Sequence, residues 1–335
     1  MKVDAEVFGG HPAEAAGLAK KAEQYGFDCF WVNETKHDPF LQLALATTST
    51  RRIGLGTSIA LAFTRSPTAL AYTSWDLQDT SGGRLILGLG SQVKGHIERR
   101  FGVRWEPPAP KMKEVVLALR SVWRTWQDGS KLEFQGKFFR LDLMTPFFSP
   151  GRIEHPFIPV YLAGVNEGMI RVAGAMAEGL HVHPLHTVRY LREVMGPALE
   201  GGAERAGRKK GDVAVAVSVF AAAGDTRSER EKLRQMYREQ IAFYASTRTY
   251  RTVLDLHGWG DVGERLHGLS VKGDWKKMPQ EVGDDMMEEF VVEGSWGEMG
   301  AILQRRYRGL ADRVRLYAPF DGKPGWRSFV QGFEA

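Results

Sequence analysis

The strongest constraint on the fold is a regular alternation of short β-rich runs with longer helical patterns along the chain. Strands that are joined by helical crossovers lie parallel to one another, and eight such units close into a barrel. The sequence therefore predicts an α/β fold, a (β/α)8 TIM barrel with insertions. The eight expected strands are residues 3–8, 29–34, 52–60, 84–90, 159–164, 179–183, 213–222 and 313–320.

No linker-like boundary interrupts this rhythm, so residues 1–335 are expected to form a single domain. The rhythm breaks over residues 128–157, which are rich in aromatic residues, Pro and Gly. We expect an insertion there, with a hairpin around residues 132–141. Several shorter helices are expected over residues 261–309. The insertion and the helical segment 255–295, which carries several Trp and Met residues, are expected to shape the substrate pocket.

Composition and charge argue against several classes of function. The net charge is only +5 and no basic run stands out, so we expect no nucleic-acid partner. No stretch approaches about 18 apolar residues, and the first residues lack an apolar signal core, so neither membrane insertion nor secretion is expected. Cys29 is the only cysteine, which excludes an internal disulfide. We therefore expect a cytoplasmic protein that binds a small molecule.

Residues 82–95, GGRLILGLGSQVKG, carry spaced glycines after an apolar run, as phosphate-binding turns do. A dinucleotide fingerprint needs a further glycine, and Val93 stands at that position. An acidic residue about twenty positions on is also missing, because that region reads WEPPAP. The stretch is better explained as the end of the fourth barrel strand and the loop that follows it.

Active sites of TIM barrels lie in the loops that follow the strands, which narrows the candidate residues. Polar, glycine and histidine residues gather at the ends of five strands, and we expect the functional site to be built from them. They are Glu34, Thr35, Lys36, His37 and Asp38 at the second strand; Thr57, Ser58 and Ile59 at the third; Ser91, Gln92, Lys94 and His96 at the fourth; Ala163, Gly164, Asn166, Glu167 and Gly168 at the fifth; and His181, His183 and His186 at the sixth.

The fifth loop, LAGVNEGMIRVAG, resembles an anion-binding site. Gly164 allows a ligand to approach the backbone, and the N–H groups of a helix that starts near Asn166 would face a phosphate. An ordinary N-cap is the alternative role for Asn166, and the loop alone favours it. A P-loop is excluded because no Gly-Lys-Ser or Gly-Lys-Thr is present.

The histidines offer two kinds of chemistry. His181 and His183 share one strand face, but no carboxylate lies at metal-ligand spacing from them. We therefore expect no metal and interpret them as lining a polar pocket. His37 is followed by Asp38, a pair that suits a proton relay. Cys29 lies within an apolar strand and is expected to be a buried, inert thiol.

Residues 52–92, RIGLGTSIALAFTRSPTALAYTSWDLQDTSGGRLILGLGSQ, resemble the luciferase-like flavin oxidoreductases. In that family a strand that ends Gly-Thr-x-Val/Ile precedes an Arg/His-Pro helix and then a Ser-Gly-Gly-Arg turn into a Leu-Gly-x-Gly strand. PVYLAG…IRVAGAMAEG at 159–179 and LADRVRLYAPF at 310–320 agree as well. HDPF at 37–40 and GSQVKGHIERRFG at 90–102 are similar to the subgroup that uses the deazaflavin coenzyme F-420.

This resemblance implies a homodimeric TIM barrel with the cofactor ring at the carboxyl ends of the strands and its phosphate at the fifth loop. It also implies a cis peptide bond at Ser58–Ile59, and Thr35 stands where many relatives carry a catalytic histidine. Carried over by position, Thr57, Ser58, Ile59, Ser91 and Gln92 belong to the ring site, and Gly164, Asn166, Glu167 and Gly168 belong to the phosphate site. Because Thr35 takes the place of the usual histidine, the candidate catalytic residues are His37, Asp38 and His183.

The resemblance favours an oxidoreductase that transfers a hydride between C5 of coenzyme F-420 and a small organic substrate. An FMN-dependent monooxygenase that uses reduced flavin and O₂ is the alternative within the same family. A non-catalytic flavin-binding barrel is a second alternative, supported by Thr35 alone. A metal-dependent hydrolase is disfavoured because the strand ends lack the necessary His and Asp cluster.

Overall fold

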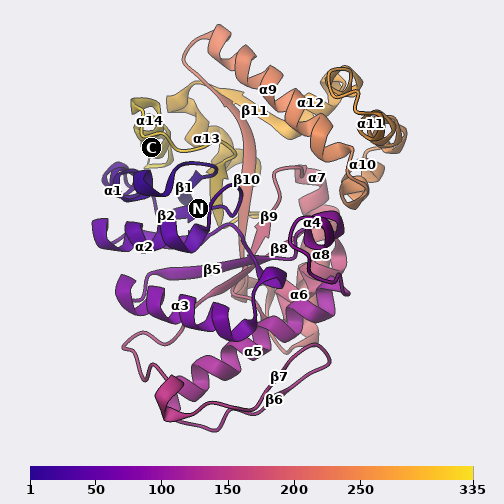
Figure 1. Ribbon diagram of the computed structural model, residues 1–335. Helices are drawn as coiled ribbons and strands as arrows, with labels where there is room; N and C mark the ends of the chain where they lie inside the picture. The colour runs from indigo at the N-terminus through magenta and orange to yellow at the C-terminus, as the bar shows by residue number, and fades with distance from the viewer. Residues whose placement is uncertain (335) are drawn as a thin grey trace.

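The computed structural model describes residues 1–334 and confirms the TIM barrel (Figure 1). The barrel strands run in the order β10–β12–β1–β2–β3–β5–β8–β9, and pairing of β9 with β10 closes the ring. All of these pairings are parallel. The strands are β1 (Lys2–Val7), β2 (Cys29–Val32), β3 (Gly54–Thr57), β5 (Leu85–Gly90), β8 (Val160–Gly164), β9 (Gly179–Val182), β10 (Ala214–Ala223) and β12 (Arg313–Leu316). They are the eight strands expected from the sequence; β1 and β10 are shifted by one residue, and the other six are shorter than expected.

The helices around the barrel begin and end where local chemistry favours it. Pro39 and Pro67 occupy first-turn positions, and Asp38 and Ser66 cap the same helices by accepting backbone N–H groups. The main helices are α1 (Ala15–Tyr25), α2 (Pro39–Ser49), α3 (Pro67–Ser81), α5 (Pro108–Asp128), α6 (Glu167–Met176), α9 (Arg227–Ala245), α13 (Trp296–Tyr307) and α14 (Pro324–Glu334). The helix expected over 187–206 is divided into α7 (Val188–Tyr190), a π turn (Leu191–Met195) and α8 (Gly196–Arg205).

Two strands were not expected from the sequence. β4 (Ala60–Leu61) lies beside the end of β5, and β11 (Val291–Gly294) pairs in parallel with the last four residues of β10. The prediction of helices alone over 261–309 was therefore wrong at β11. This strand has four residues and follows α12 (Asp284–Phe290) directly, so its local pattern is too short to distinguish it from helix.

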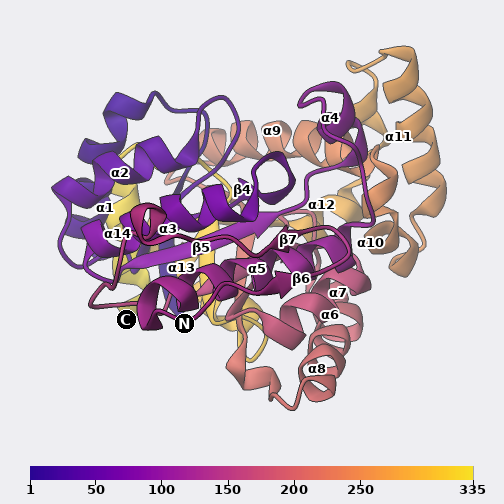
Figure 2. The same cartoon turned by 60° about the horizontal axis from the view of Figure 1, so that its bottom comes forward.

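The region of the expected insertion contains an antiparallel hairpin, β6 (Phe134–Gln135) and β7 (Arg140–Leu141). Glu114 of α5 holds its turn by accepting the N–H groups of residues 137–139, and the hairpin lies beside α5 in both views (Figures 1 and 2). The helices α10 (Arg251–Leu256), α11 (Gly260–Lys272) and α12 gather at one edge of the molecule (Figure 2).

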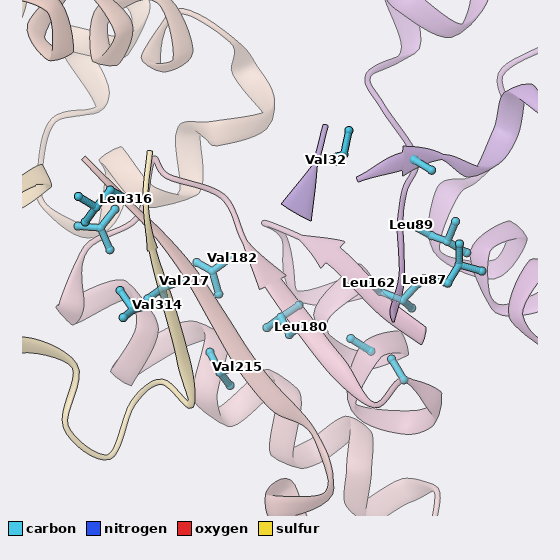
Figure 3. Packing of buried hydrophobic residues seen from close by; sticks show 14 of the residues in the cluster. Val32, Leu87, Leu89, Leu162, Leu180, Val182, Val215, Val217, Val314 and Leu316 are labelled. Atoms are coloured by element: carbon cyan, nitrogen blue, oxygen red, sulfur yellow. The ribbon is translucent and has the colours of Figure 1, made fainter. Parts of the chain in front are cut away.

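Side chains of alternate strand residues form two different cores. The larger one is apolar and lies between the strands and the surrounding helices; Figure 3 shows part of it, including Leu87, Leu162, Val217 and Val314. The second core lies inside the barrel and is partly polar. It contains a small cluster around Trp31 and Tyr161, together with buried ionic side chains. Within residues 1–334, no helix has the length and apolar character needed to cross a membrane.

Candidate active site

The end of β3 forms the centre of the candidate site. The peptide bond between Ser58 and Ile59 is cis, as the family resemblance implied. The backbone is held on both sides: the Ser58 N–H donates to the Val32 carbonyl at 2.8 Å, and the Ile59 carbonyl accepts the Glu34 N–H at 3.2 Å. The Ser58 hydroxyl accepts a hydrogen bond of 2.7 Å from the buried guanidinium of Arg315.

The two spaced glycines of β5 make room for this bend. A Cβ atom on Gly88 would lie 1.8 Å from the Thr57 carbonyl oxygen, and one on Gly90 would lie 2.6 Å from the Ile59 side chain. Thr57 is fully buried, and its hydroxyl donates to the Gly88 carbonyl at 2.6 Å. The two glycines therefore allow β3 to pack closely against β5. The Thr57 hydroxyl donates its hydrogen bond within the protein.

The loop after β2 carries His37 and is fixed to the β3 loop by ionic contacts. Arg65 donates to Glu34 and to Asp38, each at 2.7 Å, and Glu34 also accepts the Leu61 N–H at 2.8 Å. Asp38 uses its other oxygen to cap α2. Both Asp38 oxygens are thus engaged. The half-buried His37 forms no hydrogen bond with any residue in 1–334, and its ring lies edge-on to that of His11.

Ser91 and Gln92, the predicted ring contacts after β5, are both half-buried. Gln92 has a φ of 57°, a left-handed conformation that is uncommon for a residue with a side chain, and its amide oxygen accepts the Val93 N–H at 2.9 Å. The short helix α4 (Lys94–Arg99) follows. Directly after it, Arg100 donates to the Thr35 carbonyl at 2.9 Å, which ties this loop to the β2 loop.

The fifth loop leaves helix α6 open at its N-terminus. Asn166 is the N-cap residue, but its side chain does not cap the helix; it contacts the Thr249 carbonyl at 3.3 Å and the Thr252 hydroxyl at 3.1 Å. The Glu167 and Gly168 N–H groups have no acceptor within the described part of the chain. The Glu167 carboxylate pairs with Arg171, so this residue offers an anion only its backbone.

His183 follows β9 and belongs to an aromatic cluster that the sequence did not reveal. Its ring stacks on Tyr250 with centroids 4.5 Å apart, and Tyr244 approaches edge-on at the same distance. Tyr244 in turn shares a hydrogen bond with Tyr317, whose ring stacks on Phe8 at 5.2 Å. The cluster joins the ends of β1, β9 and β12 with the end of α9, so one aromatic wall borders this side of the site.

His186, the third histidine of this group, is fully enclosed. It contacts the His183 carbonyl at 2.8 Å and the Tyr307 hydroxyl at 3.1 Å, and burial lowers the pKa of His186 to about 4. His181 lies deeper in the barrel, edge-on to Trp31 at 4.7 Å. Burial, together with the charges of two neighbouring arginines, lowers the pKa of His181. Among residues 1–334, no three metal-binding side chains come together.

Two buried ion pairs lie beneath the site and were also missed from the sequence. Glu6 pairs with Arg315 at 3.1 Å, and Asp4 forms a bidentate pair with Arg313 at 2.7 and 2.8 Å. The signal was present in the sequence: DAE within 3–8 and RVR within 313–320 place charges at alternate strand positions, where they share one face. The ion pairs themselves could not be predicted from this pattern, because the opposite charges meet only where β1 lies beside β12.

Cys29 is buried as expected, and burial raises the pKa of its thiol. The other candidate residues stand at the carboxyl ends of neighbouring strands: the His37 loop after β2, Ser58 and Ile59 after β3, Ser91 and Gln92 after β5, residues 164–168 after β8, and His183 after β9. Because the strands are parallel and adjacent, all five groups lie at one end of the barrel. The free N–H groups of α6 and the aromatic wall lie at this same end.

Comparison with known proteins agrees with this architecture. The family model described as luciferase-like monooxygenase matches residues 2–313. A protein of Mycobacterium tuberculosis named as uncharacterized is 45% identical over 302 residues, which cover 90% of this chain and 89% of that protein. The 5,10-methylenetetrahydromethanopterin reductase of Archaeoglobus fulgidus is 28% identical over 283 residues, covering 82% of this chain and 80% of the reductase.

Among solved structures, the coenzyme F-420-dependent tetrahydromethanopterin reductase of Methanopyrus kandleri has a similar fold. It superposes with a TM-score of 0.81 at 24% identity, over 100% of this chain and 98% of that chain. The two proteins therefore share the barrel and its order of elements.

Proposed function

This chain belongs to the luciferase-like monooxygenase family, and we propose that it is a coenzyme F-420-dependent oxidoreductase that transfers a hydride between C5 of the deazaflavin and a small organic substrate. The observation that carries the proposal is the open N-terminus of α6 at the same barrel end as Ile59, Ser91 and Gln92. The name of the Methanopyrus reductase, which specifies coenzyme F-420, supports a deazaflavin rather than FMN.

The residues at the site fit such a cofactor. Ile59, Ser91 and Gln92 supply a half-buried surface at adjacent strands for a flat ring, with Thr57 and Ser58 buried beside them. The free N–H groups at the start of α6, with Gly164 and Asn166 beside them, would bind the phosphate through hydrogen bonds and the helix dipole. When bound, the deazaflavin supplies a hydride-accepting and hydride-donating carbon, and the protein supplies orientation and exclusion of water.

For the substrate side, we propose His37 as a general acid or base. The Arg65 contacts to Glu34 and Asp38 fix the loop that carries His37, and Asp38 acts through that loop. Thr35, at the position of the usual histidine, is exposed, and only its carbonyl is bound by Arg100. His183 borders the opposite side of the site.

Paired fluorescence titrations of the purified protein with coenzyme F-420 and with FMN test the proposal. We expect micromolar or tighter binding of F-420 and at least tenfold weaker binding of FMN. Preference for FMN would overturn the deazaflavin assignment and favour the monooxygenase that the family name describes, which oxygen consumption with reduced FMN would then measure. Binding of neither cofactor would contradict both.

We also propose that the protein is a homodimer, as the family resemblance implies. Leu41 and Leu45 lie one turn apart on α2 and are 63% and 41% exposed, which supports burial of this helix against a second copy. Light scattering coupled to size exclusion would give about 75 kDa for a dimer, twice the 37.5 kDa of the chain, and a mass near 37.5 kDa would contradict it.

A further inference from the structure

The ring of His183 has a defined tautomer. Its Nδ1 accepts the backbone N–H of Leu185 at 3.1 Å, so this nitrogen carries no proton. Burial, with the nearby His186 and Arg315, lowers the pKa of His183 to about 3, which keeps the ring neutral at physiological pH. A neutral imidazole carries one proton, and here it must be on Nε2.

That proton determines what the neighbouring phenol does. His183 Nε2 lies 3.2 Å from the Tyr250 hydroxyl, so the imidazole donates and the phenol oxygen accepts. Burial raises the pKa of Tyr250, so the hydroxyl keeps its own hydrogen. No other residue within 1–334 accepts that hydrogen, and it is therefore available to a ligand.

Tyr250 is also tied to the loop proposed for the phosphate. It ends the 3-10 helix η6 (Arg248–Tyr250), in which the Thr249 carbonyl accepts the Asn166 side chain. The η6 helix thus contacts the fifth loop through Thr249 and the end of β9 through the Tyr250 hydroxyl. The groups in contact with its ring, His183 and Tyr244, are neutral and aromatic.

We propose that Tyr250 is a catalytic residue for the reversible reduction of a ketone. As the carbonyl carbon gains a hydride from the reduced deazaflavin, the C=O π bond opens and its oxygen takes the proton of the Tyr250 hydroxyl, which the phenolate then recovers from water. Oxidation of a secondary alcohol is the reverse: water takes the Tyr250 proton, and the phenolate accepts the alcohol proton as the carbon loses its hydride. The substrate class is then a neutral ketone or secondary alcohol with an apolar or aromatic flank. His183 acts as a positioning residue, because its Nε2–H fixes the phenol oxygen and directs the remaining hydrogen away from the imidazole. The inference rests on the proposed hydride transfer.

The test compares Tyr250→Phe, which removes the hydroxyl and keeps the stacked ring, with the unmodified protein. The probes are cyclohexanone and acetophenone with reduced F-420, and cyclohexanol and 1-phenylethanol with oxidised F-420. We expect kcat to fall by about 10²-fold, as for other removed donors to a reacting oxygen, with the Kd for F-420 unchanged within about twofold. Tyr25→Phe is the matched control, since that hydroxyl binds the Gly322 carbonyl away from the site and kcat should not change.

A second measurement does not depend on turnover. Nitrogen-15 spectra of histidine-labelled protein should show His183 with its proton on Nε2 and an unprotonated Nδ1, in the unmodified protein and in Tyr250→Phe. A proton on Nδ1 would overturn the inference, as would an unchanged kcat in Tyr250→Phe. Binding of F-420 without turnover of any of the four probes would overturn the substrate class and leave the cofactor assignment standing. Failure to bind F-420 would overturn both proposals.

Discussion

His183 and His186 are three residues apart, yet their protons lie on different ring nitrogens. His186 Nδ1 faces the His183 carbonyl at 2.8 Å and must donate to it, so its Nε2 accepts from Tyr307. His183 has the opposite arrangement, because a backbone N–H occupies its Nδ1. The two residues are chemically identical, so the sequence does not distinguish their tautomers. Their hydrogen-bond partners in the folded chain determine which ring nitrogen carries the proton.

At the residue scale, we predict that the free energy of unfolding falls as the pH drops from about 6.5 to about 4. The pKa of His186 is lowered to about 4 when folded, so in this range the unfolded chain binds a proton that the folded chain does not. Protonation therefore favours unfolding, and a shift from 6.5 to about 4 corresponds to roughly 3 kcal/mol. Urea unfolding across this pH range measures the slope.

His186→Asn should reduce that slope, because the titrating group is removed. His96→Asn is the control, since His96 is exposed on α4, and its slope should match that of the unmodified protein. Equal slopes in all three proteins would show that another group causes the acid sensitivity.

At the scale of elements, the open end of α6 can be tested through its backbone. Glu167→Pro removes one N–H at the first helical position, where proline is tolerated, and Asn166 already has the extended conformation that proline requires before it. We predict that this change raises the Kd for F-420 by about tenfold, because hydrogen bonds to charged groups contribute about 1.5–3 kcal/mol. Fluorescence titration measures the affinity.

Glu167→Ala is the matched control, because it also removes the carboxylate paired with Arg171 but keeps the N–H group. Its affinity should equal or exceed that of the unmodified protein. Neither variant should change the binding of a deazaflavin that lacks the phosphate. An equal loss of affinity for that compound would mean that α6 does not bind the phosphate.

Arg65 joins two other elements, the loops after β2 and β3. Its side chain and that of Glu34 are 21% and 10% exposed, so solvent screens this contact only in part. We predict that Arg65→Gln lowers the free energy of unfolding by about 1–2 kcal/mol and speeds hydrogen exchange of the Leu61 N–H, which Glu34 accepts. Urea unfolding and exchange mass spectrometry measure the two effects.

Lys131→Gln is the control for that variant. Lys131 and Glu133 form an exposed pair, with 79% and 66% of the side chains accessible, so its loss should change the unfolding free energy by less than about 0.5 kcal/mol. Unchanged exchange at Leu61 in Arg65→Gln would contradict a bracing role for Arg65.

At the scale of the whole molecule, the first and last barrel strands are joined by a buried ion pair. Asp4 of β1 accepts two hydrogen bonds from Arg313 of β12 and a third from the Trp31 indole at 2.8 Å. We predict that Asp4→Asn lowers the free energy of unfolding by about 3–5 kcal/mol, because it leaves the guanidinium buried without a counter-charge. Urea unfolding at neutral pH measures the loss.

The double variant Asp4→Leu with Arg313→Met removes both charges and should recover most of that stability, since replacement of a buried pair by apolar groups is often neutral or stabilising. If the double variant were less stable than Asp4→Asn, the ion pair would stabilise the fold by more than the mutual neutralisation of its two charges.

The order and type of the elements could be predicted from the sequence, because they depend on local patterns. The alternation of β-rich and helical segments gave all eight barrel strands. The fifth loop alone favoured an ordinary N-cap for Asn166, and this was wrong, because the side chain binds Thr249 and Thr252 instead. Local pattern failed where an element was too short to carry one, as at β11. It also did not show that the side chain of Asp38 caps α2 and binds Arg65.

Only the tertiary structure decided which distant residues meet and in which charge state. Glu6 and Arg315 are separated by most of the chain and pair because β1 lies beside β12, whereas Tyr250 reaches His183 from the 3-10 helix η6. Protonation follows from those contacts, since burial and hydrogen-bond partners shift a pKa and neither exists until the barrel closes. The sequence therefore determined the barrel and the loops that bear function, and closure of the barrel determined the chemistry available in them.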